Sequence, residues 1–120
     1  MSKEINSRKF LFISRWGESL DIALATLQEG NEVKMYIEDK ASREIGYGFI
    51  KKVQDWKKHI DWADVLIFDY TGHGKICEEL RAKGKLVFGG TSYTDALELD
   101  RNFGQEELKR HKINILPFKE

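Results

Sequence analysis

The chain has 120 residues and a mass of 14.0 kDa, which is the size of one ordinary domain. Basic and acidic side chains number 20 each, and the resulting net charge of zero argues against a strongly basic nucleic-acid binder. The sequence has no apolar run near the roughly 18 residues of a membrane span and no apolar signal-peptide stretch at its start. Cys77 is the single cysteine, which excludes an intrachain disulfide, so we expect a reducing, cytoplasmic setting. From the charge balance and the lack of a long apolar run we expect neither nucleic-acid nor membrane partners.

The first half of the chain alternates between strand and helix patterns. Residues 9–14 form a short apolar, aromatic-rich run typical of a buried strand. Residues 18–30 place their apolar side chains on one helical face and end in glycine, so they predict a helix. Alternating apolar and polar residues predict a strand over 32–37, and the polar stretch 38–48 predicts a loop. Residues 49–60 carry apolar side chains at helical spacing, and we expect a helix there.

The second half continues the alternation. Residues 64–70 give the clearest strand prediction, because a near-continuous apolar run is typical of a strand covered on both faces. A helix is expected over 75–83, a strand over 85–90 and a long polar helix over 95–111. A short extended piece is expected over 113–118. We therefore predict one α/β domain over residues 1–120, with a three-layer, Rossmann-like parallel sheet.

In such sheets a ligand binds at the carboxyl ends of the strands, where the strand order reverses. Three loops follow predicted strands and are therefore candidate ligand-binding loops: Ser14–Ser19, Tyr70–Gly74 and Gly89–Asp95. The first of them combines a glycine and hydroxyls directly before a helix, a setting in which backbone N–H groups bind anions. Its sequence lacks the G-x-G-x-x-G spacing of a dinucleotide-binding fingerprint, and an ordinary turn capped by serine is the alternative. The ligand contacts predicted here are Arg15, Gly17, Glu18 and Ser19.

The second and third loops supply the other candidate contacts. Two glycines flank His73, and they let the backbone approach a ligand closely. We predict contacts from Gly72 and His73, although a tight loop with a solvent-exposed histidine is the alternative for His73. In the third loop the predicted contacts are Gly89, Gly90 and Thr91.

Further along, a short helical piece runs into a longer helix that opens near Asp100. This places Arg101 in the first helical turn, where a cation is mildly unfavourable unless it meets an anion.

These segments resemble the N-terminal domain of ATP-grasp ligases, above all the phosphoribosylamine–glycine ligase (glycinamide ribonucleotide synthetase) family of purine biosynthesis. The similarity spans about residues 9–118. Its most specific features are Phe88-Gly89-Gly90-Thr91, Leu97-Glu98, Arg101 and Lys112-Ile113.

The resemblance implies a pre-ATP-grasp domain whose first loop holds a phosphate-bearing amine substrate and whose Arg101 reaches the nucleotide phosphates. Enzymes of this family use ATP and Mg²⁺ to convert a carboxylate into an acyl phosphate, which an amine then attacks. Because the ATP-grasp and C-terminal domains are missing from this chain, the resemblance implies that they are partners, that the chain is not catalytic alone, and that neither ATP nor Mg²⁺ binds it tightly.

The sequence departs from the family pattern in its first loop, which is usually richer in glycine, and in Arg101, where the family has lysine. Arginine keeps the positive charge and still binds phosphate.

Two alternatives stay open. One is a free-standing Rossmann-like module that binds a small phosphate-bearing ligand or forms a homodimer through an exposed sheet edge or helix. The other is a phosphoacceptor receiver-like domain, indicated by Asp69 at a strand end and Thr91 after the next strand; the acidic pair that receivers need after the first strand is replaced by Ser14 and Arg15.

Overall fold

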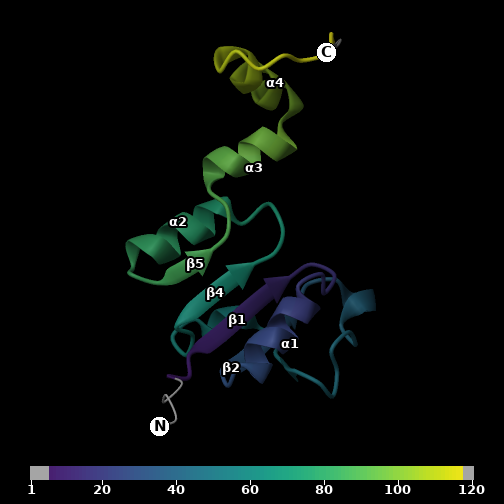
Figure 1. Cartoon of the computed structure of the whole chain (residues 1–120), viewed down its shortest axis with the longest axis vertical. Coiled ribbons are helices and arrows are strands. Elements are labelled where there is room, and N and C mark those ends of the chain that lie inside the picture. Colours follow the sequence, from purple (N-terminus) through teal and green to yellow (C-terminus); the bar gives the residue numbers. More distant parts are fainter. Residues whose placement is uncertain (1–5, 118–120) are drawn as a thin grey trace.

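The computed structural model describes residues 6–117 and contains a five-stranded, fully parallel sheet (Figure 1). The strands are β1 (Lys9–Ser14), β2 (Glu32–Ile37), β3 (Lys51–Lys52), β4 (Val65–Phe68) and β5 (Leu86–Phe88). The helices are α1 (Leu20–Gln28), α2 (Gly74–Ala82), α3 (Ser92–Leu99) and α4 (Arg101–Arg110), with short 3₁₀ turns η1 (Lys40–Ser42) and η2 (Trp56–His59). The predicted α/β, Rossmann-like parallel sheet is confirmed.

The strand order is β3-β2-β1-β4-β5, so the chain reverses its direction of travel across the sheet between β1 and β4. β1 pairs with both neighbours along its length, with Phe12 opposite Met35 of β2 and Ile67 of β4. Parallel strands end at one edge of the sheet, and the reversal leaves room there for a crevice. The three loops selected from the sequence all leave strands at this edge.

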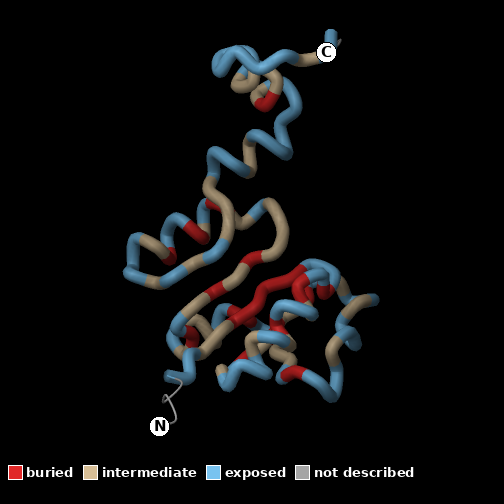
Figure 2. Tube along the Cα trace, in the orientation of Figure 1, coloured by how far each residue is buried: buried red, intermediate tan, exposed pale blue. Residues whose placement is uncertain are grey.

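An apolar core lies on each face of the sheet. On one face Leu11, Ile13 and Leu66 pack with Cys77 of α2 and Trp56 of η2. On the other face α1 covers β1 and β2, where the largest buried side chains are Phe12, Met35 and Ile37. Figure 2 shows this burial concentrated along β1 at the centre of the sheet. Cys77 is a small buried core residue.

The helix expected over residues 49–60 is wrong. Lys51 and Lys52 instead form β3 beside Lys34 and Met35 of β2, and the 3₁₀ turn η2 follows. The Val53 N–H also donates to the Met35 carbonyl at 2.9 Å, so this segment pairs the outer backbone of β2, which a helix would leave unpaired. Spacing alone did not predict this outcome, because apolar residues at helical spacing also fit the strand and the 3₁₀ turn, in which Trp56 is buried.

The long C-terminal helix expected over 95–111 is two helices, and the second opens at Arg101 as the sequence indicates. Asp100 has an extended backbone (φ −111°, ψ 100°), and its side chain accepts the Phe103 N–H at 3.0 Å. This carboxylate therefore ends α3 and caps α4. Residues 113–117 form neither helix nor strand, and residue 118 lies outside the described residues.

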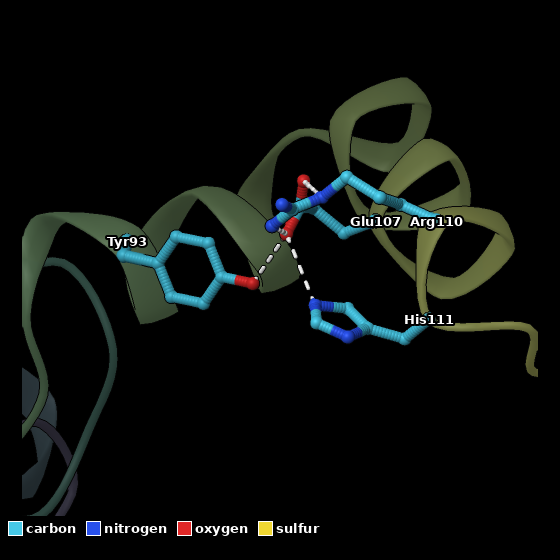
Figure 3. Close-up of polar contacts among 4 residues, drawn as sticks. All are labelled: Tyr93, Glu107, Arg110 and His111. Carbon is cyan, nitrogen blue, oxygen red and sulfur yellow. Dashed lines mark hydrogen bonds and ion pairs between the residues drawn. The ribbon is translucent and has the colours of Figure 1, made fainter.

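α3 and α4 form an arm that extends away from the sheet (Figure 1). Glu107 lies at the centre of the polar contacts within the arm (Figure 3). Its carboxylate accepts hydrogen bonds from Arg110 Nε at 2.9 Å and from the Tyr93 hydroxyl. His111 Nε2 lies 3.8 Å from Glu107 Oε2. Tyr93 also packs edge-to-face on Phe103. These contacts join α3 to α4 and leave the arm's outer surface exposed (Figure 2).

Among the described residues, none of the helices has the length and apolar character needed to cross a lipid bilayer.

Candidate functional site

Within the described part of the chain, a cleft lies on each side of the switch point at the carboxyl edge of the sheet. The β4–β5 cleft, of about 450 Å³, lies between the ends of β4 and β5 and helix α3. Its polar lining includes Asp69, Thr71, Asp95 and Glu98, and Phe88 forms part of its apolar wall. The β1–β2 cleft, also about 450 Å³, is lined by Arg15, Trp16, Glu38, Asp39 and Lys40.

The first loop is closed by its own glutamate. Glu18 Oε2 accepts the Trp16 N–H at 2.9 Å and the Ser14 hydroxyl at 3.0 Å. The Ser14 hydroxyl in turn accepts the Gly17 N–H at 2.8 Å. Burial raises the pKa of Glu18, but hydrogen bonds from backbone N–H groups and Ser14, with the nearby Arg15 charge, bring its pKa below the usual value. The loop N–H groups that would bind an anion are thus already paired, partly with a carboxylate.

Asp69 and Ser19 meet at the switch point. Asp69 Oδ2 accepts the Ser19 N–H at 3.1 Å, so the end of β4 supplies a carboxylate to the N-terminus of α1. The other carboxylate oxygen, Asp69 Oδ1, and the Ser19 hydroxyl are both buried and have no hydrogen-bond partner. A buried acceptor without a partner is unfavourable by about 1–3 kcal/mol, so this pair is a place where an added O–H or N–H group is stabilised.

The N-terminus of α2 is also occupied by a carboxylate. Asp95 of α3 accepts the Gly74 N–H at 2.7 Å and the Gly72 N–H at 3.0 Å. Gly74 lies so close to the third loop that a Cβ on it would fall 2.2 Å from the Thr91 carbonyl carbon. Glycine is therefore required for the second and third loops to touch at this point.

His73 belongs to a hydrogen-bonded chain that crosses the edge of the sheet. Its Nε2 lies 2.6 Å from the Tyr70 hydroxyl, which donates to Glu38 Oε2 at 3.0 Å. Burial lowers the pKa of His73, although Glu38 and Asp95 raise it in part. Burial and donation to the Glu38 carboxylate raise the pKa of Tyr70. His73 is half-buried among aromatic rings, and the chain ties the second loop to the end of β2.

Side chains of α2 hydrogen-bond to the third loop and fix its position. Arg81 donates to the Gly89 carbonyl at 2.7 Å and to the Gly90 carbonyl at 2.9 Å. Thr91 forms a capping box with Thr94 at the start of α3. Glu78 of α2 accepts the Ser92 N–H at 3.0 Å. Every helix that begins at this edge therefore has a carboxylate of the chain among its N-terminal contacts.

The structure brings some predicted contact residues together and separates others. Gly89 and Gly90 line the β4–β5 cleft. At its border the Gly72 N–H donates to Asp95 and the Thr91 N–H donates to Thr94. Arg15 lies in the β1–β2 cleft, where its guanidinium stacks on Trp16. Arg101 opens α4 and lines a different hollow in the arm, which shares only Glu98 with the β4–β5 cleft.

Sequence reasoning missed the carboxylates that surround the clefts: Glu38, Asp95 and Glu98. The signals were present, because Glu38 directly follows a predicted strand, and Asp95 and Glu98 are three residues apart in a helical segment and so share a face. Trp16 is 51% exposed at the rim of the β1–β2 cleft.

Comparison with solved structures places the chain among Rossmann-like α/β domains. It is similar to shikimate dehydrogenase from Aquifex aeolicus (TM-score 0.57, 16% identity), covering 72% of this chain and 44% of that one. It is also similar to a V8 variant of the imine reductase from Myxococcus stipitatus in complex with NAD⁺ (TM-score 0.57, 17% identity), covering 90% of this chain and 37% of that one. The chain thus spans less than half the length of either enzyme. No family model matches the sequence, and neither does any curated protein.

These findings correct the family expected from the sequence. The matching structures are oxidoreductases with Rossmann-like domains, so the assignment to phosphoribosylamine–glycine ligases and to purine biosynthesis is wrong. The expectation that the full enzyme uses ATP and Mg²⁺ as cofactors rested on that assignment and is wrong as well. The motifs that carried the resemblance, such as Phe88-Gly89-Gly90-Thr91, are explained locally: the glycines pass close to Cys77 and Thr94, and Thr91 caps α3.

Proposed function

We propose that this chain is a Rossmann-like binding domain for a small ligand that carries O–H or N–H donors and no pyrophosphate, held in the β4–β5 cleft. The observation that carries the proposal is the unpaired, buried pair of Asp69 Oδ1 and Ser19 Oγ at the switch point. Asp69 itself lines the cleft. Oδ1 has almost no exposed surface, so a ligand hydroxyl or amine supplies the missing hydrogen bond once the Asp69 side chain turns Oδ1 toward the cleft.

The fold neighbours raise the possibility of a nicotinamide dinucleotide, because one of them is a complex with NAD⁺. One residue of this chain fits: Glu38 follows β2, where an acidic side chain accepts the ribose hydroxyls in dinucleotide-binding domains. That carboxylate, however, already accepts the Tyr70 hydroxyl. The loop Ser14–Ser19 has one glycine in place of the three that let the backbone reach a pyrophosphate.

Charge argues more strongly against a pyrophosphate. In dinucleotide-binding domains the helix N-terminus after β1 donates its free N–H groups to the phosphates. Here the Trp16 and Ser19 N–H groups donate to Glu18 and Asp69. A phosphate bound at the N-terminus of α1 would find these N–H donors already paired. It would also be repelled by the two carboxylates, which carry negative charge as the phosphate does. The residues present therefore do not fit the pyrophosphate of NAD⁺.

The β4–β5 cleft has complementary chemistry for a neutral or cationic ligand. Phe68, Val87 and Phe88 give it an apolar wall, and carboxylates stand along its other side. Sugars, nucleosides and amines combine apolar rings or chains with hydrogen-bond donors in the required way. The same geometry favours a ligand without phosphate over the phosphate-bearing amine that the family resemblance implied.

Isothermal titration separates these ligands. D-ribose and adenosine are titrated into the full chain beside ADP-ribose and NAD⁺, which add a pyrophosphate to the same donors. We expect adenosine or ribose to bind at millimolar concentration or below, and the pyrophosphate compounds to bind at least tenfold more weakly. Absence of binding by both neutral probes, or tighter binding of NAD⁺, contradicts the proposal.

Asp69→Asn is the matched variant. Asparagine keeps one oxygen to accept the Ser19 N–H and replaces the unpaired acceptor with a donor, so the fold is retained while ligand binding falls about tenfold or more. Asp61→Asn makes the same charge change at an exposed position outside both clefts, and it should bind as the parent chain does.

A further inference from the structure

Two lysines without an ion-pair partner lie side by side at the β3 edge of the sheet. Lys34 of β2 and Lys51 of β3 are partners in the parallel register, so their side chains project from the same face, opposite α1. Among residues 6–117, no carboxylate forms an ion pair with either lysine. Adjacent like charges on a sheet are unfavourable, and burial together with the charge of Lys51 lowers the pKa of Lys34.

Protection of the sheet edge explains only one of these lysines. A lysine on an edge strand discourages pairing with another sheet, and Lys51 on β3 suits that task. Lys34 lies one strand further in, where β3 already covers the outer side of its strand. Edge protection does not require a charge at that position, so the pairing of the two lysines calls for another explanation.

Two rings that follow β3 fix the position of the Lys34 ammonium. Its Nζ lies 3.1 Å from His59 Nδ1 and 4.0 Å from the centre of the Trp62 ring. Burial and the neighbouring lysine charges lower the pKa of His59, so its ring is neutral at about pH 7 and Nδ1 accepts from the ammonium. An ammonium has three N–H donors, and within the described part of the chain no oxygen accepts the others. These donors are available to a ligand.

A hollow of about 290 Å³ opens beside the two lysines at the start of β2. Glu32 supplies the one carboxylate in its lining, and Glu32 is the register partner of Lys9 on β1, which places an opposite charge beside it. Three lysines and one glutamate therefore meet around the hollow, and positive charge is in excess. The remaining lining residues are uncharged: Leu27, Asn31, Val33 and Trp62.

We propose that this hollow binds a small molecule through a phosphate monoester group, with Lys34 and Lys51 as the donors. A phosphate monoester carries nearly two negative charges and three acceptor oxygens, so it can accept from both lysines at once. A phosphate diester carries one charge, as each phosphate of NAD⁺ and ADP-ribose does, and matches the two lysines less well. The hollow lies at the start of β2, away from the carboxyl edge, so the inference does not depend on the ligand proposed above.

NMR titration of the full chain with methyl phosphate tests the site, at about pH 7.5, which is above the second pKa of about 6 for a phosphate ester. Ionic strength is held constant with sodium chloride because screening weakens contacts between exposed charges. We expect saturable shifts of the Lys34 and Lys51 amide signals and of the Trp62 indole N–H, with a Kd of about 1–10 mM. Dimethyl phosphate, which carries one charge, should bind about tenfold more weakly.

The His59 ring provides a second readout. Burial and the charges of Lys34, Lys51 and Lys58 lower its pKa, and Asp55 raises it in part. A bound dianion offsets the lysine charges, so saturation with methyl phosphate should raise the pKa of His59, measured from the chemical shifts of its ring protons. The same concentration of dimethyl phosphate should change this pKa much less.

Lys51→Met removes one donor at an exposed position and should weaken methyl phosphate binding about tenfold. Lys52→Met is the matched control, since it removes the same charge from the next residue of β3. The Lys52 side chain projects from the α1 face beside Met35, and its Nζ donates to the Ile45 carbonyl. Lys52→Met should bind as the parent chain does. The absence of saturable shifts up to about 50 mM, equal weakening by both substitutions, or equal binding of the two esters overturns the proposal.

Discussion

Removal of the Asp95 carboxylate tests the finding that the chain caps its own helices at the carboxyl edge of the sheet. Asp95 makes two charge-assisted hydrogen bonds to the N-terminus of α2, at 2.7 Å to Gly74 and 3.0 Å to Gly72. Such bonds contribute about 1.5–3 kcal/mol each when buried, and loss of a helix cap is worth about 1 kcal/mol. Since Gly72 is exposed, we expect Asp95→Ala to lower the free energy of unfolding by about 2 kcal/mol.

Urea unfolding at one fixed protein concentration measures this change. With a slope of about 2 kcal/mol/M, the expected loss moves the midpoint down by about 1 M. Asp95→Asn keeps one acceptor oxygen and should lose about half as much. Asp61→Ala, the exposed control, should stay within ~0.5 kcal/mol of the parent chain. An Asp95→Ala midpoint within 0.25 M (roughly 0.5 kcal/mol) of that control refutes the reasoning.

The same variant gives a second readout. Without Asp95, the Gly72 and Gly74 N–H groups at the start of α2 are free to bind an anion. Sodium sulfate should therefore stabilise Asp95→Ala more than it stabilises the parent chain or Asp61→Ala. Equal stabilisation of all three proteins means that Asp95 does not occupy an anion site.

Three further predictions concern neighbouring contacts. Gly74→Ala should destabilise the chain by about 3 kcal/mol in urea unfolding, because its Cβ would fall 2.2 Å from the Thr91 carbonyl carbon; Lys75→Ala, the exposed neighbour, should change little. Burial lowers the pKa of His73 in the folded chain, so on acidification the unfolded chain takes up a proton at a higher pH than the folded chain does. The contribution of neutral His73 to the free energy of unfolding should therefore be complete above pH ~6.5 and fall as the pH decreases below that value. His73→Gln should reduce this loss between pH 7 and 5.5, and an unchanged slope contradicts the assignment. Arg81→Ala should lower stability by about 2 kcal/mol and increase light scattering on storage, because three carbonyls near the β5 edge lose their donor; a variant as stable and as soluble as the parent chain contradicts this role.

The sheet was predictable from the sequence because its central strands carry unambiguous patterns. The apolar run at 64–70 and the strand at 9–14 leave little choice other than buried parallel strands, and the intervening helices fix the crossovers. The segment 49–60 was not predictable, since its apolar spacing suits a helix while the unpaired backbone of β2 requires a strand. That requirement is tertiary and has no local signal.

Switch-point reasoning selected three loops that all leave strands at one edge of the sheet, and their role in binding stays a prediction. That reasoning also assumed that helix N-termini at this edge are free to bind anions. The structure shows why that assumption fails here: Asp69 contacts Ser19 across 50 residues, and Asp95 contacts Gly74 across 21. Sequence spacing gives no indication of such distant partners.

Carboxylates and exposed apolar side chains lie on different parts of the molecule. Carboxylates gather at the strand ends, where Glu18, Asp69 and Asp95 accept N–H groups. Within residues 6–117, the buried side-chain atoms without a hydrogen-bond partner are Asp69 Oδ1 and Ser19 Oγ. Uncovered apolar side chains gather instead on the α1 side of β5. A ligand that satisfies Asp69 Oδ1 leaves Leu86 exposed, because Leu86 lies outside the lining of the β4–β5 cleft, whereas Phe88 belongs to that lining. Asp69→Asn should therefore weaken ligand binding without changing the exposed apolar surface at Leu86.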